Sequence, residues 1–200
     1  MCDIFKIMEI SGIILAGDKS RRIKADKATL DLGNKTLIVN AIDILKPLCS
    51  QIIISRNRSA ISNISKTYKT IIDENPDIGP VQAICSCLKK SDHLINVVLA
   101  CDVPFVKPSF FSYLIRQYNF QKKGIVPVIN GKYQPLIAVY HKSAFYDFEK
   151  RIKNKIFTLI DVIKTSNYQI IKINQLKENE FLNINTRADL EKARQYINQN

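Results

Sequence analysis

The stretch GIILAGDKSRRIKADKATL, residues 12–30, joins a strand-like run to a strongly charged loop. Apolar residues lead directly into Gly17, a pattern typical of a buried strand that ends in a turn. The loop sets five cations against Asp18 and Asp26, a formal charge of +3, and the cations are Lys19, Arg21, Arg22, Lys24 and Lys27. Such a loop can be merely solvated. It can also bind phosphate, because glycine lets main-chain N–H groups approach phosphate oxygens and arginine holds them through two hydrogen bonds.

Strand-like and helix-like segments alternate along the rest of the chain. Short apolar runs predict strands at 11–16, 51–55, 69–73, 93–100 and 168–173. Helical spacing predicts helices at 36–48, 59–66, 79–90, 107–119, 142–153, 156–164 and after Thr186, where Asp189 completes a capping-box pattern. GIVPVI and YQPLIAVY, around the turn NGK (130–132), predict two further strands. We therefore expect one α/β domain over residues 1–200, with a three-layer, Rossmann-like, doubly wound, mostly parallel sheet and an antiparallel insertion.

Composition narrows the class of protein. The net charge of +12 comes mostly from scattered lysines, and no recognition helix or arginine–aromatic cluster stands out, so we expect no nucleic-acid partner. No apolar run approaches the length of a membrane span and the N-terminus lacks the pattern of a signal peptide, which predicts a cytoplasmic protein with no membrane partner. The five cysteines are odd in number and show no zinc spacing, so we interpret them as reduced and mostly buried.

The loops that follow strands are the places to look for chemistry, because ligands of such sheets bind beyond the carboxyl ends of the strands. Asp102, in LACDVPFV, either binds Mg²⁺ or caps a turn before Pro104. Asn183 and Asn185 either face a ligand together or, for Asn185, belong to the turn before the last helix. Asp73 ends another strand ahead of a helix that starts at Gly79–Pro80. The two histidines, His93 and His141, we interpret as structural.

In this order the motifs resemble molybdenum cofactor guanylyltransferase, over about residues 12–193. The resemblance rests on LAG-x-K-S-x-R, the following DK, D-x-x-P-x-x-GP, CD-x-P and F-L-N-I-N-T-x-x-D-L. It implies a fold like that of the nucleotide-diphospho-sugar transferases and the transfer of GMP from GTP to the phosphate of molybdenum-molybdopterin, with Mg²⁺ and release of pyrophosphate. It also suggests proteins of molybdoenzyme maturation as partners, without identifying one.

The resemblance also implies roles for individual residues. It assigns nucleotide binding to Leu15, Ala16, Gly17, Lys27, Ser55, Asp73 and Asp102, with Asp102 also the metal ligand. Arg22, Lys27 and Asp102 would be the catalytic residues. Asn183 and Asn185 would lie near the acceptor phosphate.

The chain departs from the family pattern at several positions. Asp18 and Lys24 stand where the family has glycines, Ser55 where it has asparagine, and Gln82 where it has a small residue. These departures leave two alternatives open: a nucleotide-binding relative with weak or no turnover, and a related nucleotidyltransferase that uses CTP or another phosphorylated acceptor.

Overall fold

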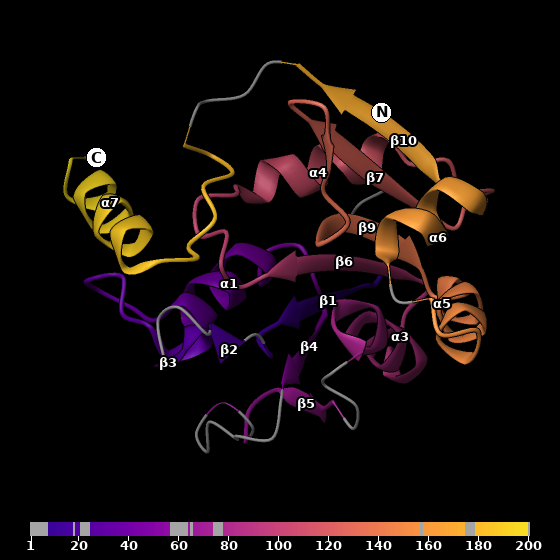
Figure 1. Ribbon diagram of the computed structural model, residues 1–200, viewed down its shortest axis with the longest axis horizontal. Coiled ribbons are helices and arrows are strands. Elements are labelled where there is room, and N and C mark those ends of the chain that lie inside the picture. The colour runs from indigo at the N-terminus through magenta and orange to yellow at the C-terminus, as the bar shows by residue number, and fades with distance from the viewer. Residues whose placement is uncertain are drawn as a thin grey trace.

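A computed structural model describes residues 8–17, 19–20, 25–56, 64, 66–73, 78–156, 158–174 and 179–199 (Figure 1). Its centre is an eight-stranded sheet with the order β10-β7-β9-β6-β1-β4-β5, and β8 pairs with β7. The strands are β1 (Ile10–Leu15), β4 (Gln51–Arg56), β5 (Lys69–Ile72), β6 (Ile95–Ala100), β7 (Gly124–Ile129), β8 (Lys132–Tyr133), β9 (Ile137–His141) and β10 (Gln169–Ile173). Neighbouring strands are parallel except where β8 and β9 take part, which confirms the mostly parallel sheet with an antiparallel insertion.

Helices cover both faces of this sheet, as the doubly wound class predicts. One core contains side chains of α1 and α4, and the other contains side chains of α3, α5 and α6. Successive side chains of a strand point to opposite faces, so Ile14 of β1 enters the first core and Ile13 the second, and both are fully buried. The helices are α1 (Leu37–Leu45), α3 (Pro80–Lys90), α4 (Pro108–Gln117), α5 (Ala144–Lys153), α6 (Leu159–Thr165) and α7 (Arg187–Asn198).

The antiparallel insertion differs in detail from the sequence expectation. Asn130 and Gly131 have φ angles of 49° and 74° and form the turn between β7 and β8, but that hairpin pairs only two residues on each side. The expected strand 133–140 is interrupted at Pro135, which has no N–H to donate to a ladder. The chain resumes as β9, which lies inside the main sheet between β7 and β6 (Figure 1).

The last helix begins as the sequence predicts. The Thr186 hydroxyl accepts a hydrogen bond from the Asp189 N–H at 3.1 Å, and the Asp189 carboxylate accepts one from the Thr186 N–H at 2.8 Å. The pKa of Asp189 is held below its usual value, chiefly by a side-chain hydrogen bond with Thr186 and further by the backbone N–H groups of Asn185 and Thr186. The helix expected at 59–66 lies almost entirely outside the described residues.

The described cysteines match the interpretation of buried, reduced thiols. Cys49, Cys85, Cys87 and Cys101 are all free, and all but the half-buried Cys49 are buried. Burial raises the pKa of the Cys49 and Cys87 thiols to about 12. Among the described residues, no helix combines the length and apolar character needed to cross a membrane.

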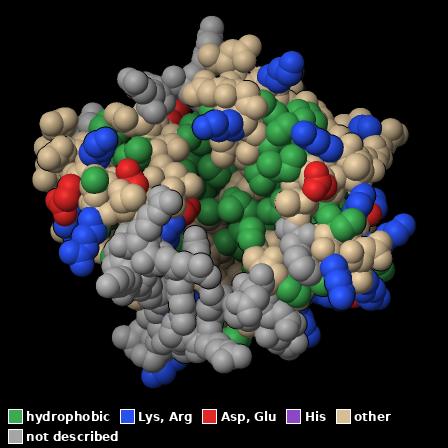
Figure 2. Space-filling view, viewed as in Figure 1, with side chains coloured by type: hydrophobic (Ala, Val, Ile, Leu, Met, Phe, Trp, Pro, Cys, Tyr) green, Lys and Arg blue, Asp and Glu red, His purple; other side chains and the backbone are tan. Residues whose placement is uncertain are grey.

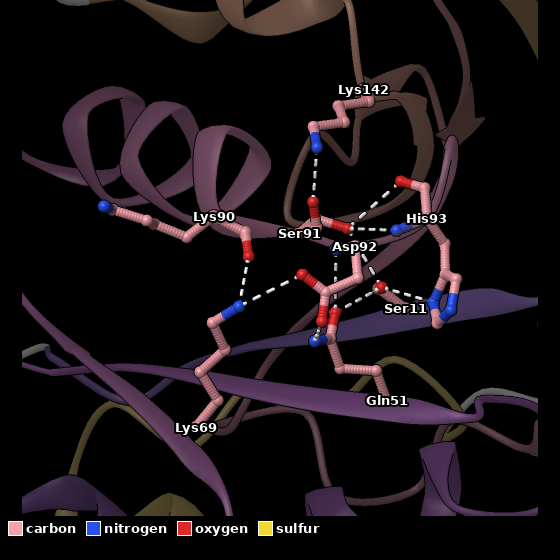
Figure 3. Close-up of polar contacts among 8 residues, drawn as sticks. All are labelled: Ser11, Gln51, Lys69, Lys90, Ser91, Asp92, His93 and Lys142. Carbon is pink, nitrogen blue, oxygen red and sulfur yellow. Dashed lines mark hydrogen bonds and ion pairs between the residues drawn. The ribbon is translucent and has the colours of Figure 1, made fainter.

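A polar cluster lies at the amino ends of β1 and β4 and links them through hydrogen bonds (Figure 3). Ser91 donates to the Ser11 hydroxyl at 2.9 Å, Ser11 donates to the Gln51 side chain at 2.7 Å, and the His93 ring lies 2.9 Å from the same hydroxyl. Ser11 and Ser91 are buried, so these bonds satisfy hydroxyls that water does not reach. The cluster therefore lies at the end of the sheet opposite to the carboxyl ends of the parallel strands. The position of His93 in this cluster agrees with a structural role.

Candidate functional site

A cavity of about 210 Å³ lies at the carboxyl ends of β1, β4, β5 and β6. Strand β1 has β4 on one side and β6 on the other, so the strand order reverses here, where doubly wound sheets bind ligands. Apolar side chains gather around a hollow near the middle of the face in Figure 2. The lining residues are Leu15, Gly17, Lys27, Ser55, Asp73, Gly79, Pro80, Ala83, Ala100, Cys101, Asp102 and Leu136.

Three predicted site residues meet at one ammonium group. The Lys27 Nζ atom lies 2.9 Å from Oδ2 of Asp102 and donates to Oδ1 of Asn185 at 2.8 Å. The side chains of Lys27 and Asp102 are only 3% and 13% exposed, so the pair is shielded from the water that weakens surface ion pairs. A charged amine can be buried here because oxygens on two separate segments accept hydrogen bonds from it.

Main-chain hydrogen bonds hold these residues in place. Asp102 lies two residues beyond β6. The preceding residue, Cys101, still pairs with β1, because its N–H donates a hydrogen bond of 3.1 Å to the Leu15 carbonyl. The segment before α7 is tied to the same point, because the Ile184 N–H donates to the Asp102 carbonyl at 2.8 Å. Lys27 begins a short 3-10 helix, Lys27–Thr29, closed by a bond from the Leu30 N–H to the Lys27 carbonyl. The site is thus assembled from three parts of the chain far apart in sequence.

Only one of the two Asp102 carboxylate oxygens accepts a hydrogen bond within the described part of the chain. Oδ1 is buried and has no hydrogen-bond partner among the described residues, whereas Oδ2 is bound to Lys27. A carboxylate that only capped a turn would accept from a nearby backbone N–H, so this geometry favours the other interpretation, a cation ligand. A buried, unbonded carboxylate oxygen at a cavity wall fits a hard divalent cation such as Mg²⁺. Within the described chain, no group of three or more His, Cys, Asp and Glu side chains is placed to hold a metal ion.

Ser55 and Asp73 lie on the other side of the cavity. Both are buried, and the Asp73 N–H donates to the Arg56 carbonyl at 2.7 Å, which continues the pairing of β4 with β5. Ser55 forms a side-chain hydrogen bond with Cys87, which lowers the pKa of that thiol but does not offset the effect of its burial. Ser55 therefore presents a small hydroxyl where the family pattern has an amide.

The structure does not bring every predicted residue to the cavity. Ala16 is buried and donates its N–H to the Ser55 carbonyl at 2.9 Å, so it joins β1 to β4 without lining the cavity. Asn183 and Asn185 are both exposed and neither lines the cavity, although the Asn185 side chain reaches Lys27. Arg22 lies outside the described residues, as do Asp18 and Lys24.

Some lining residues were not predicted as site residues. Leu136 and Ala100 contribute apolar surface, and the Ala100 N–H donates to the Leu136 carbonyl at 2.9 Å. Nothing in the local sequence marks Leu136, because its place in the cavity depends on the insertion of β9 beside β6. The sequence marks Gly79 as the N-terminus of a helix near Asp73, with a positive dipole end, and the structure adds that it lines the cavity. Its φ of +80° is a backbone conformation that favours glycine, and it turns the chain so that Pro80 and Ala83 face the cavity.

Comparison with known proteins places this geometry in a family. The sequence model of the MobA-like NTP transferase domain matches residues 12–164. A probable molybdenum cofactor guanylyltransferase of Natranaerobius thermophilus is 30% identical, over 94% of this chain and 96% of its own. Another, of Carboxydothermus hydrogenoformans, is 33% identical over 90% of this chain and 92% of its own.

Solved structures agree with the sequence comparison. Molybdopterin-guanine dinucleotide biosynthesis protein A of Archaeoglobus fulgidus superposes with a TM-score of 0.80 at 25% identity, covering 95% of this chain and 100% of that one. A CMP:2-keto-3-deoxy-manno-octonic acid synthetase complexed with CTP has a TM-score of 0.76 at 14% identity, covering 96% and 99%. The second likeness confirms the predicted fold alone, that of the nucleotide-diphospho-sugar transferases.

Proposed function

Because the chain belongs to the MobA-like NTP transferase family, we propose that it transfers GMP from GTP to the terminal phosphate of molybdenum-molybdopterin. The acceptor phosphate oxygen attacks the α-phosphorus of GTP, the bond between the α-phosphorus and the bridging oxygen breaks, and pyrophosphate leaves. The observation that carries the proposal is the meeting of Lys27, Asp102 and Asn185 beside a cavity at the switch point of the sheet. Nucleotidyl transfer needs positioning and charge neutralisation more than a covalent catalyst, and this site offers both.

The cavity offers a polar wall and an apolar wall to the nucleotide. Leu15, Ala83 and Leu136 supply apolar surface against which a flat base can pack. Gly17 is at the end of β1, where its backbone can approach the phosphates closely. Asp73 we assign to the nucleoside, since it lies across the cavity from the Lys27 and Asp102 pair in the strand order.

The charged side chains that line the described cavity sum to a negative charge, which favours the binding of a cation. Lys27 carries one positive charge, whereas Asp73 and Asp102 carry two negative charges, so the described lining has a net charge of −1. These three lining charges taken alone would repel a triphosphate, and a divalent cation bound with the nucleotide would reverse their sum. We assign Mg²⁺ to Oδ1 of Asp102, with the remaining ligands from phosphate oxygens and water, as Mg²⁺ prefers. When bound, the ion neutralises the charge that develops on the phosphates.

The acceptor would approach from the side of the segment before α7. Asn185 already places its amide oxygen at the Lys27 ammonium, and Asn183 stands exposed two residues earlier on the same segment. Lys27 can then hold a phosphate oxygen of GTP while the Asn183 and Asn185 amides orient the acceptor phosphate. We expect the reaction in the cytoplasm, with a molybdoenzyme maturation protein receiving the product.

Calorimetry with GTP, CTP and ATP in Mg²⁺ tests the nucleotide. We expect a clear preference for GTP, followed by formation of the guanine dinucleotide and pyrophosphate when molybdenum-molybdopterin is added. A preference for CTP would instead favour the alternative of a related nucleotidyltransferase that uses CTP. Failure to bind any of the three at millimolar concentration would refute the proposed function.

A further inference from the structure

The Lys27 ammonium is bound to the same carboxylate, that of Asp102, that would ligate a divalent cation. Its Nζ atom is 2.9 Å from Oδ2 of Asp102, and the hydrogen bond of 2.8 Å to Asn185 fixes it there from a second side. Only 3% of the Lys27 side chain is exposed, so this position belongs to the folded core. Oδ1 of the same carboxylate is buried beside it, without a hydrogen-bond partner in the described part of the chain.

We propose that Lys27 gates the cation site, so that Asp102 binds a divalent cation well only after a triphosphate has drawn Lys27 away. The inference rests on the proposed function in that it takes the triphosphate to be the trigger. It goes further by assigning Lys27 a second role, as the residue that couples cation binding to nucleotide binding. In this role Lys27 acts as a positioning residue for Asp102.

Electrostatics supports the gate. A doubly charged ion at Oδ1 would share one carboxylate with an ammonium group less than 3 Å from the other oxygen, and the two cations would repel strongly in a site shielded from water. The ammonium also neutralises the charge that makes the carboxylate attractive. Both effects weaken cation binding while Lys27 remains in place.

The chemistry of lysine allows the gate to open. Its compact charge sits on a flexible stem of four methylene groups and can be redirected without moving the backbone. Phosphates, like carboxylates, accept strong charge-assisted hydrogen bonds from an ammonium, so a triphosphate can compete with Asp102 for Lys27. When Lys27 turns to the phosphates, the charge of the Asp102 carboxylate is no longer offset by the ammonium, and both of its oxygens are available to a cation. Nucleotide and cation then strengthen each other's binding by the same factor, as linkage requires.

The test measures binding of Mn²⁺ alone, by the electron paramagnetic resonance signal of the free ion, with no nucleotide present. The variant is Lys27→Gln, whose neutral amide can still donate to Asp102 and Asn185, and the control is Lys35→Gln. Lys35 also lies 2.8 Å from a carboxylate, that of Asp43, but it does not line the cavity. We expect Lys27→Gln to bind Mn²⁺ about tenfold or more tightly than the wild type, and the control to bind like the wild type.

A purely structural role for Lys27 predicts the opposite result. Loss of a structural contact would loosen the site and weaken Mn²⁺ binding, so unchanged or weaker binding by Lys27→Gln would overturn the gate. The same variant should bind GTP more weakly than the wild type, because the phosphates lose a cation. The two measurements fail independently. Failure of the wild type to bind GTP refutes the proposed function, whereas the Mn²⁺ titration of Lys27→Gln, made without nucleotide, decides the gate.

A second measurement covers the case in which Lys27→Gln does not fold. In wild-type protein labelled with ¹⁵N-lysine, the Lys27 ammonium resonance reports its partners directly. We expect it to shift when GTP is added without any divalent cation, and to remain unchanged when Mn²⁺ alone is added at a concentration that saturates the complex with GTP. An unmoved resonance in a protein that calorimetry shows to bind GTP would refute the gate.

Discussion

The strength of the Lys27–Asp102 ion pair can be measured by a double-mutant cycle in the free protein. The cycle compares the wild type with Lys27→Met, Asp102→Asn and the double variant, using the free energy of unfolding from urea titration at neutral pH. Each single substitution leaves the other charge without its ion-pair partner in a largely buried place, so each should be destabilising. The double substitution should cost less than the sum of the two, because the second removes the charge that the first left behind.

The structure sets the size of the expected coupling. At the observed 2.9 Å and an effective dielectric constant of 20, the attraction between two unit charges is about 6 kcal/mol. Desolvation of two side chains that are 3% and 13% exposed offsets a large part of this attraction. A hydrogen bond to a charged group contributes about 1.5–3 kcal/mol net, so we expect a coupling energy of about 2–3 kcal/mol.

The chain provides its own control for this measurement. Lys35 and Asp43 lie 2.8 Å apart, nearly the same distance, but their side chains are 32% and 51% exposed. Exposed pairs typically contribute about 0.2–1 kcal/mol, so the same cycle at this pair should give a clearly smaller coupling. Equal couplings at the two pairs, or a value below about 0.5 kcal/mol at Lys27–Asp102, would refute the reasoning that burial makes this ion pair strong.

Three further predictions concern activity, nucleotide affinity and stability. Asp102→Asn should abolish Mg²⁺-dependent formation of pyrophosphate, because the amide lacks the charge that holds the cation; turnover at the wild-type rate would show that Asp102 is not the metal ligand. Asp18→Gly should tighten GTP binding in calorimetry by removing a negative charge from the phosphate loop, and an unchanged affinity would mean that the carboxylate points away from the phosphates. Gly124→Ala should lower the midpoint of thermal unfolding, because the new Cβ would lie 2.6 Å from the Val139 carbonyl oxygen. A wild-type midpoint for Gly124→Ala would show that β7 and β9 can separate without loss of stability.

Local patterns made most of the fold and part of the site predictable. A buried strand such as β6 is apolar at every position except Asn96, and the charged residue just beyond it, Asp102 in the sequence CDVP, stands out from that run. The capping box at Thr186 and Asp189 needs only residues three apart, so the sequence contains it fully. Predictions failed where pairing is remote. The place of β9 between β7 and β6 is decided by which strands meet in space, and Pro135 and the short β8 give no local sign of it.

The Lys27–Asn185 hydrogen bond joins residues 158 positions apart, and it answers a choice that the sequence left open. Asn185 could belong to the turn before α7 or face the site, and the structure shows that different atoms of the same residue do both. Its backbone N–H donates to the Asp189 carboxylate at 3.0 Å, while its side-chain oxygen accepts from Lys27 at 2.8 Å. The cap therefore fixes the backbone from which the amide reaches the site. It follows that loss of the Asp189 carboxylate should disturb Lys27 as well as α7: Asp189→Asn should shift the Lys27 ammonium resonance. Glu191→Gln, at an exposed carboxylate two residues further along α7 that pairs with Arg194, should leave the resonance unchanged.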